Sequence, residues 1–172
     1  AVTSMIEYIL KSYKSSTDLS FLDIGCGNGW VVRKVLESEI FSSGKGIDGS
    51  STMIENALDI DPKGNYECAM LDSYIDTDSY NTIFSMEFIY YLNDPVSSMR
   101  PLVSSSLKDN GLFIIGVDFY KENERSHSWP NDLGIYMNLK SINDWADILK
   151  KIGLRNIDYW TIGETLVVYG YK

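Results

Sequence analysis

The residues best suited to chemistry lie in one short segment near the amino terminus. It reads Asp23-Ile-Gly25-Cys26-Gly27-Asn-Gly29, an acid followed by three glycines at alternate positions. An apolar run, 19–24, leads into it, and a run of helical period, 30–36, follows it. A strand, a glycine-rich turn and a helix in this order let the backbone of an open α/β sheet approach an adenosine-type ligand. The segment therefore predicts a nucleoside-binding turn.

The acid at position 23 restricts which ligand can bind there. A dinucleotide turn of the GxGxxG type would have glycine where Trp30 stands, and Asp23 would repel a diphosphate. No Gly-Lys-Ser/Thr sequence follows the glycines, so a P-loop is excluded as well. A carboxylate at this turn favours a ligand that carries an ammonium or a sulfonium and no phosphate.

The segment from Asp23 to Gly29 resembles the first motif of class I S-adenosylmethionine-dependent methyltransferases, (Asp/Glu)xGxGxG, and is most similar to their small-molecule, type 11 branch. S-adenosylmethionine carries both an ammonium and a sulfonium and no phosphate. The resemblance implies that Asp23, Gly25, Gly27 and Gly29 contact this cofactor. Cys26 is interpreted as a small packing residue inside the same cofactor-binding turn.

The resemblance also implies an architecture and an activity. The expected fold is α/β and Rossmann-like, with a doubly wound, mostly parallel seven-stranded sheet whose last strand is antiparallel. Residues 1–172 would form a single methyltransferase domain. Its activity would be methyl transfer, by in-line displacement, to a small-molecule acceptor.

Apolar periodicity predicts the elements that position this turn. Strands and helices alternate along the chain, which favours a parallel sheet with helices on both faces. Asp94-Pro95 and the sequence from Ser141 to Asp144 are typical of helix starts, and Ser50 or Ser51 can cap another helix. Helices are expected at 4–13, 30–36, 51–60, 95–110 and 142–152, and strands at 19–24, 47–48, 65–71, 81–88, 112–117, 155–161 and 165–171.

Three acids follow three successive strands of this scheme, and each matches a part of the cofactor. Asp48 would accept both ribose hydroxyls, Asp72 the adenine amino group, and Asp23 would lie near the methionine ammonium. Gly49 would belong to the same site, and Met53 or Leu71 would pack on the face of the adenine ring. The alternative is that these acids cap helices or form turns by hydrogen bonding to their own backbone.

The sequence from Ser85 to Leu92 resembles the fourth motif of the family, where the strand end contacts the methionine part of the cofactor. Ser85 is therefore a further cofactor candidate. Glu87 is a candidate catalytic residue, and Tyr90 and Tyr91 are candidate substrate contacts. The alternative is that this aromatic run packs in the core or in a lid.

Residues 118–140 form the longest stretch without clear periodicity, and such loops often cover binding sites. This stretch is interpreted as a substrate lid. His127, the only histidine, or Asp118 is a candidate proton acceptor, and Tyr120 and Trp129 are candidate substrate contacts. The alternative is a surface loop with a solvated histidine. A base is needed only if the acceptor is protonated at working pH.

Composition narrows the classes of partner. The 172 residues carry a net charge of −9 and have no Lys- or Arg-rich stretch, so nucleic acid is not expected. No apolar run reaches the ~18–20 residues of a membrane span. Cys26 and Cys68 give no metal-binding spacing, and a reducing, cytoplasmic location is the expectation. The oligomeric state is left open.

Three rival functions remain at this point. The chain could be a non-catalytic methyltransferase-fold partner subunit, or it could methylate a protein side chain. A nicotinamide-dependent oxidoreductase is disfavoured by Asp23 and Trp30.

Overall fold

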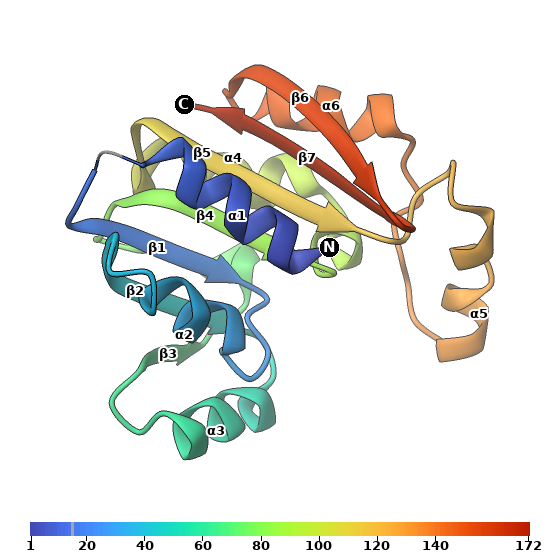
Figure 1. Cartoon of the computed structure of the whole chain (residues 1–172). Helices are drawn as coiled ribbons and strands as arrows, with labels where there is room; N and C mark the ends of the chain where they lie inside the picture. Colours follow the sequence, from blue (N-terminus) through green and yellow to red (C-terminus); the bar gives the residue numbers. More distant parts are fainter. Residues whose placement is uncertain (15) are drawn as a thin grey trace.

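The computed structural model describes residues 1–14 and 16–172. Seven strands form one sheet in the order β3-β2-β1-β4-β5-β7-β6 (Figure 1). The pairings between β1, β2, β3, β4 and β5 are parallel, whereas β7 is antiparallel to both β5 and β6. The predicted architecture is therefore confirmed. The strands are β1 (Leu19–Ile24), β2 (Phe41–Asp48), β3 (Asn65–Cys68), β4 (Tyr80–Met86), β5 (Leu107–Val117), β6 (Arg155–Ile162) and β7 (Thr165–Tyr171).

Helices cover both faces of the sheet. Side chains of α1, α2 and α3 pack in one apolar cluster, and those of α4 and α6 pack in another. Successive residues of a strand point to opposite faces of the sheet, so neighbours in β5 belong to different clusters. Phe113 belongs to the cluster that contains α6, and Ile114 belongs to the cluster that contains α1. The helices are α1 (Val2–Ser12), α2 (Trp30–Leu36), α3 (Ser51–Ile60), α4 (Pro95–Ser106), α5 (Trp129–Leu133) and α6 (Ile142–Lys151), with 3₁₀ turns η1 (Leu71–Ser73), η2 (Ile89–Tyr91) and η3 (Glu124–Ser126).

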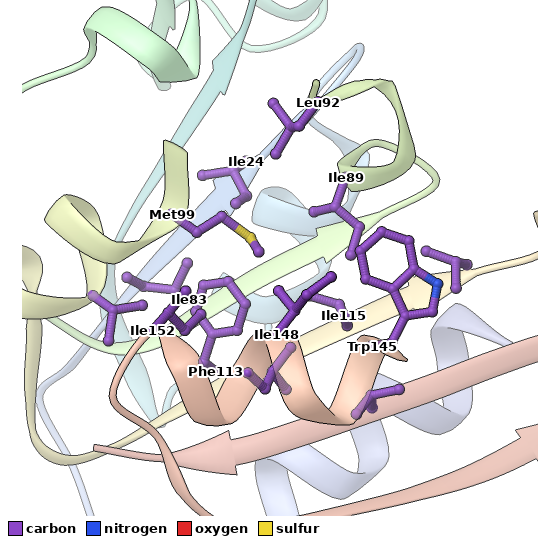
Figure 2. Close-up of a cluster of buried hydrophobic side chains, with 14 of the residues drawn as sticks. Ile24, Ile83, Ile89, Leu92, Met99, Phe113, Ile115, Trp145, Ile148 and Ile152 are labelled. Atoms are coloured by element: carbon purple, nitrogen blue, oxygen red, sulfur yellow. The ribbon is translucent and has the colours of Figure 1, made fainter. Parts of the chain in front are cut away.

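The cluster beneath α4 and α6 supports the carboxyl ends of the central strands. Figure 2 shows Trp145 and Ile148 facing Ile115, with Ile89 and Leu92 at the upper edge of the same cluster. Trp145 is completely buried. Because interiors are closely packed, this cluster holds the segment after β4 in a defined position.

The predicted helix starts are confirmed. Ser50 accepts a hydrogen bond from the Met53 N–H and so caps α3. Asp94 caps α4 immediately before Pro95, and Ser141 begins α6 with a complete capping box. Each cap satisfies backbone N–H groups that have no partner inside the helix.

Two predicted boundaries at the sheet were wrong. The helix expected to continue to Asn110 ends at Ser106, and β5 begins at Leu107, which pairs with Tyr80. The pairing shifts register before Leu112, and Asn110 adopts a φ of 60° there. Asn110-Gly111 therefore lies within an irregular strand rather than at a helix end, because pairing with β4 outweighs the local turn preference.

The edge of the sheet next to the site also differs from expectation. Residues 65–71 were predicted as a strand, but β3 ends at Cys68, which pairs with Asp48, the last residue of β2. With no partner strand beyond this point, the chain turns into η1, and Asp72 lies in that turn instead of at a strand end. β2 is longer than the predicted 47–48 because residues from Phe41 onward pair with β1.

None of the helices within residues 1–14 and 16–172 has the length and apolar character required to cross a membrane.

Candidate functional site

A cavity of about 420 Å³ opens at the carboxyl ends of β1, β2 and β4. β1 lies between β2 and β4, so the strand order reverses here, and this is where open α/β sheets bind ligands. The volume is within the usual range for small-molecule sites. The wall is mostly apolar and carries three acids; it consists of Ile24, Gly25, Ile47, Asp48, Gly49, Ala69, Met70, Leu71, Asp72, Glu87, Phe88, Tyr91, Leu92 and Asn93.

The glycine turn borders this cavity in a conformation that suits only glycine. Gly25, Gly27 and Gly29 have φ angles of 75°, 53° and 74°. A Cβ on Gly25 would lie 2.5 Å from Phe88 Cβ, and one on Gly29 would lie 2.3 Å from the Tyr66 ring. A Cβ on Gly27 would meet open space. Gly25 and Gly29 therefore allow close packing against Phe88 and Tyr66, and the backbone at Gly27 is left open to a ligand.

Cys26 lies inside the turn and is buried. Burial raises the pKa of its thiol above the ordinary range. This placement agrees with the interpretation of Cys26 as a packing residue, since a neutral buried thiol is unreactive.

Asp48 connects the end of β2 to the glycine turn. Its Oδ2 accepts a hydrogen bond from the Gly27 N–H at 2.9 Å, and its Oδ1 accepts one from the Ser50 N–H at 2.9 Å. Asp48 thus forms a turn, as the alternative interpretation held, yet it also lines the cavity. Each carboxylate oxygen keeps a second lone pair, so a diol could still be bound.

Asp23 lines a second, smaller hollow of about 200 Å³, together with Gly25, Cys26 and Gly27 of the turn. Its side chain is buried, and Oδ1 has no hydrogen-bond partner in the part of the chain that the structure describes. Burial and the charge of Asp48 raise the pKa of Asp23 to about 8. Buried polar atoms are rarely left unpaired, so this oxygen is a candidate contact for a bound ligand. Gly25 lines both hollows.

The adenosine-side candidates are only partly brought together. Gly49 and Asp72 line the main cavity, and Asp72 also accepts a hydrogen bond from the Ser98 hydroxyl. Met53 is 44% exposed on α3 and lies outside the cavity lining. Met70 lines the cavity instead, with its sulfur 2.7 Å from where a Gly49 Cβ would be. Met70 was missed because the sequence placed it inside a strand.

Ser85 does not face either hollow. It is buried, and its hydroxyl donates to the Ile24 carbonyl oxygen at 2.9 Å, which links β4 to β1. The structure therefore gives the Ser85 side chain a structural hydrogen bond rather than a ligand contact.

Glu87 follows β4 and lines the cavity. Its Oε1 accepts a hydrogen bond from the Asp118 N–H at 2.5 Å, and its Oε2 accepts one from the Tyr90 hydroxyl at 2.9 Å. Tyr91 also lines the cavity, whereas Tyr90 is buried behind Glu87. Of the residues predicted after β4, Glu87 and Tyr91 are therefore in contact range of a ligand.

Residues 118–140 lie beyond the carboxyl end of β5, to one side of the sheet (Figure 1). None of them lines the main cavity. Tyr120 is buried, and Trp129 stacks on Phe119 with ring centroids 6.5 Å apart. The segment is tied to η2 by the Asn138 N–H, which donates to the Tyr90 carbonyl at 2.7 Å. Its role as a substrate lid stays a prediction.

His127 is exposed and its Nε2 lies 3.1 Å from the Lys121 carbonyl oxygen. The structure does not bring it to the cavity. We therefore expect His127→Ala to leave methyl transfer within roughly twofold of wild type, as for a surface substitution. Initial rates with labelled methyl donor measure this, and a hundredfold loss would restore His127 as the base.

Comparisons with known proteins identify the family. The chain matches the family model described as "Methyltransferase domain" over residues 3–159. It belongs to this family, and the resemblance to class I S-adenosylmethionine-dependent methyltransferases is confirmed.

One curated relative is the tRNA U34 carboxymethyltransferase of Campylobacter fetus subsp. fetus (strain 82-40). It is 24% identical over 181 residues, which cover 94% of this chain and 62% of that protein. The chain thus spans less than two thirds of the length of this relative.

Two solved structures share the fold. One belongs to the complex between the Haloferax volcanii Trm112 methyltransferase activator and a methyltransferase, with TM-score 0.85, 23% identity and coverage of 96% of this chain and 87% of that one. The other is an S-adenosylmethionine-dependent methyltransferase from Mesorhizobium loti, with TM-score 0.76, 19% identity and full coverage of both chains.

Proposed function

We propose that the protein transfers the methyl group of S-adenosylmethionine to a small-molecule acceptor. The observation that carries this proposal is the pair of hollows that meet at Gly25. The larger has an apolar wall and an acid at the end of β2, which suits adenosine. The smaller holds the buried Oδ1 of Asp23, for which the described residues offer no hydrogen-bond partner, and which suits an ammonium.

The residues present fit this cofactor. Asp48, Leu71, Met70 and Asp72 all line the cavity. Asp48 would accept the ribose hydroxyls, Leu71 and Met70 would pack beside the adenine, and Asp72 would accept from its amino group. The open space at Gly27 leaves room for the methionine part. Asp23 would bind the ammonium, because a carboxylate attracts a cation and accepts its hydrogen bonds.

The chain contributes mainly binding and orientation to the reaction. The bound cofactor supplies a methyl carbon that is already activated by a positively charged sulfur. Holding an acceptor in line with that carbon can lower the barrier by roughly 7–11 kcal/mol. Phe88, Tyr91 and Leu92 line the cavity and would exclude water from the reacting atoms.

The charge of the protein supports a small acceptor over tRNA. The net charge is −9, and no Lys, Arg or His is among the residues that line the cavity within the described ranges. Binding of nucleic acid depends largely on cations that neutralise phosphates. The Campylobacter relative acts on tRNA according to its name, so tRNA is the second candidate, and it is favoured by that comparison alone.

The first experiment separates cofactor classes. We expect S-adenosylhomocysteine to raise the melting temperature of the purified chain, because a ligand present at 100 times its Kd stabilises by about 2.7 kcal/mol. NADH serves as the control and should produce no shift. A shift with NADH alone would overturn the methyltransferase proposal.

The second experiment separates acceptor classes. Labelled methyl donor is incubated with the chain and with a metabolite extract, bulk tRNA or a protein extract. Label in the metabolites is expected; label confined to tRNA or protein would transfer the function to those acceptors. No label in any fraction despite cofactor binding would favour a partner subunit, and the comparison with an activator complex makes this outcome worth testing.

A further inference from the structure

We infer that Glu87 takes the proton from the methyl acceptor, and that the acceptor is an amine. This inference rests on the proposed function and deepens it by assigning the proton acceptor and the class of nucleophile.

The backbone at Glu87 is held in an unusual conformation. Glu87 has a φ of 56°, in the left-handed region that non-glycine residues rarely adopt. Its N–H donates to the Gly116 carbonyl oxygen at 2.9 Å, so the neighbouring strand β5 stabilises the bend. Such conformations are energetically unfavourable and cluster at functional sites. Here the bend directs the residue after β4 into the cavity wall.

The carboxyl group is fixed as well. One oxygen accepts from the Asp118 N–H and the other from the Tyr90 hydroxyl. Tyr90 is itself buried, with its ring against Phe119 at 5.7 Å and Tyr91 at 4.6 Å between centroids. Tyr90 is therefore a positioning residue. Each oxygen of Glu87 retains a lone pair that can receive a proton.

The surroundings tune this group for proton transfer near neutral pH. Burial, then the charge of Asp118, raise the pKa of Glu87 to about 7, and the two donated hydrogen bonds act in the opposite direction. The titratable groups that face it are Asp118 at the end of β5 and Tyr90 and Tyr91 in η2. A general base is most efficient when its pKa lies close to the working pH.

The charge left on the cavity wall selects the nucleophile. Asp48 and Asp72 are assigned to the ribose and the adenine of the cofactor, so Glu87 is the acid of the wall that remains for the acceptor, and no Lys, Arg or His lines the cavity within the described residues. A negatively charged wall attracts cations and repels carboxylates and phosphates. An amine arrives as an ammonium and meets this requirement, but it must lose a proton before it can attack.

The reaction combines proton transfer to Glu87 with methyl transfer from the donor of the proposed function. The ammonium gives one proton to an oxygen of Glu87, and the freed nitrogen lone pair forms the bond to the methyl carbon. The carbon–sulfur bond breaks and its electron pair stays on sulfur, which leaves a neutral thioether. Glu87 then releases its proton to solvent, and the product is a methylated ammonium.

The test begins with binding to the protein saturated with S-adenosylhomocysteine. Calorimetry with methylammonium, benzylamine and phenethylamine should detect binding, and benzoate and phenyl phosphate should bind at least tenfold more weakly. Glu87→Gln should weaken amine binding about tenfold. The control Glu124→Gln, which removes an exposed acid in η3, should have no effect. Stronger binding of the anions, no detectable amine binding, or an unchanged affinity in Glu87→Gln would overturn the inference.

The same amines are then offered with labelled methyl donor. Glu87→Gln should lower kcat by about 10²–10⁴-fold, the usual contribution of a general base, and Glu87→Asp should recover part of it. Retention of wild-type kcat in Glu87→Gln, or no methylation of any amine by wild type, would contradict the inference.

The pH profile separates a base from a merely structural carboxyl. Tyr90→Phe removes a hydrogen bond that lowers the pKa of Glu87, so the acidic limb of the rate profile should move to higher pH. Asp118→Asn removes a charge that raises this pKa but keeps the backbone donor, so the limb should move to lower pH. Shifts in the same direction, or none, would remove Glu87 from the reaction. S-adenosylhomocysteine affinity should remain unchanged in Tyr90→Phe and Asp118→Asn, whose side chains do not line the cavity. Failure of wild type to bind S-adenosylhomocysteine would instead contradict the proposed function.

Discussion

Replacing Asp48 with alanine is expected to weaken S-adenosylhomocysteine binding by about two to four orders of magnitude. A carboxylate that accepts both ribose hydroxyls makes two charge-assisted hydrogen bonds, each contributing roughly 1.5–3 kcal/mol. Asp48 also accepts the Gly27 and Ser50 N–H groups, so its removal loosens the glycine turn as well. Both effects lower affinity, and calorimetric titration of wild type and variant measures their sum.

A second ligand isolates the ribose contact from the effect on the turn. Wild type should bind the 2′-deoxy analogue of S-adenosylhomocysteine at least tenfold more weakly than the parent, and Asp48→Ala should bind the two about equally. Asp59→Ala, which removes an exposed acid from α3, serves as the matched control and should behave as wild type. If the variant still discriminated between the ligands by the wild-type factor, Asp48 would not bind the ribose.

Asp23 should make the stability of the ligand-free protein depend on pH. Its folded pKa of about 8 lies above the ordinary value of 3.8, so the folded state holds a proton that the unfolded state has lost. Between these values the unfolded state binds fewer protons, and stability falls as pH rises, by up to about 1.4 kcal/mol per pH unit. Below the ordinary pKa both states are protonated and this dependence vanishes.

Denaturant unfolding of Asp23→Asn measures this contribution. The amide has nearly the same shape and does not ionise, so the variant should gain stability over wild type steadily from pH 4 to pH 8. Other titrating groups cancel in the difference. Asp59→Asn should show no such trend, and a flat difference for Asp23→Asn would mean that Asp23 titrates normally.

The same carboxyl should couple cofactor binding to proton release. An ammonium beside Asp23 favours the charged form, which lowers its pKa on binding. Titrations at pH 7 in two buffers of different ionisation enthalpy should therefore show close to one proton released in wild type and none from this site in Asp23→Asn. Equal proton release in both proteins would place the ammonium elsewhere.

Local sequence signals were sufficient for the turn and for most element starts. The three glycines need positive φ angles or close packing, and no other residue type tolerates both, so their spacing alone predicts the turn. The caps at Ser50, Asp94 and Ser141 act within four residues of the chain. Interactions between residues so close in the chain can be predicted from the local sequence alone.

The ends of the strands near the site are set by pairing with their neighbouring strands, and the local sequence does not reveal this pairing. β3 ends where β2 ends, and this boundary moved Asp72 into η1 and put Met70 on the cavity wall in place of Met53. The start of β5 at Leu107 follows from pairing with Tyr80 in β4. Strand pairing joins residues far apart in sequence, and a periodicity argument does not contain that information.

The roles of the candidate side chains depend on the tertiary structure more than on the local sequence. The types and spacing of the residues determined that this chain builds a glycine turn with an acid before it, in a family that uses S-adenosylmethionine. Only the folded chain separates Ser85, whose hydroxyl is bound to Ile24, from Glu87, which faces the cavity two residues later. Likewise, it leaves His127 on the surface. Exposure, hydrogen-bond partners and shifted pKa values arise from neighbours brought together by folding, so they are properties of the tertiary structure.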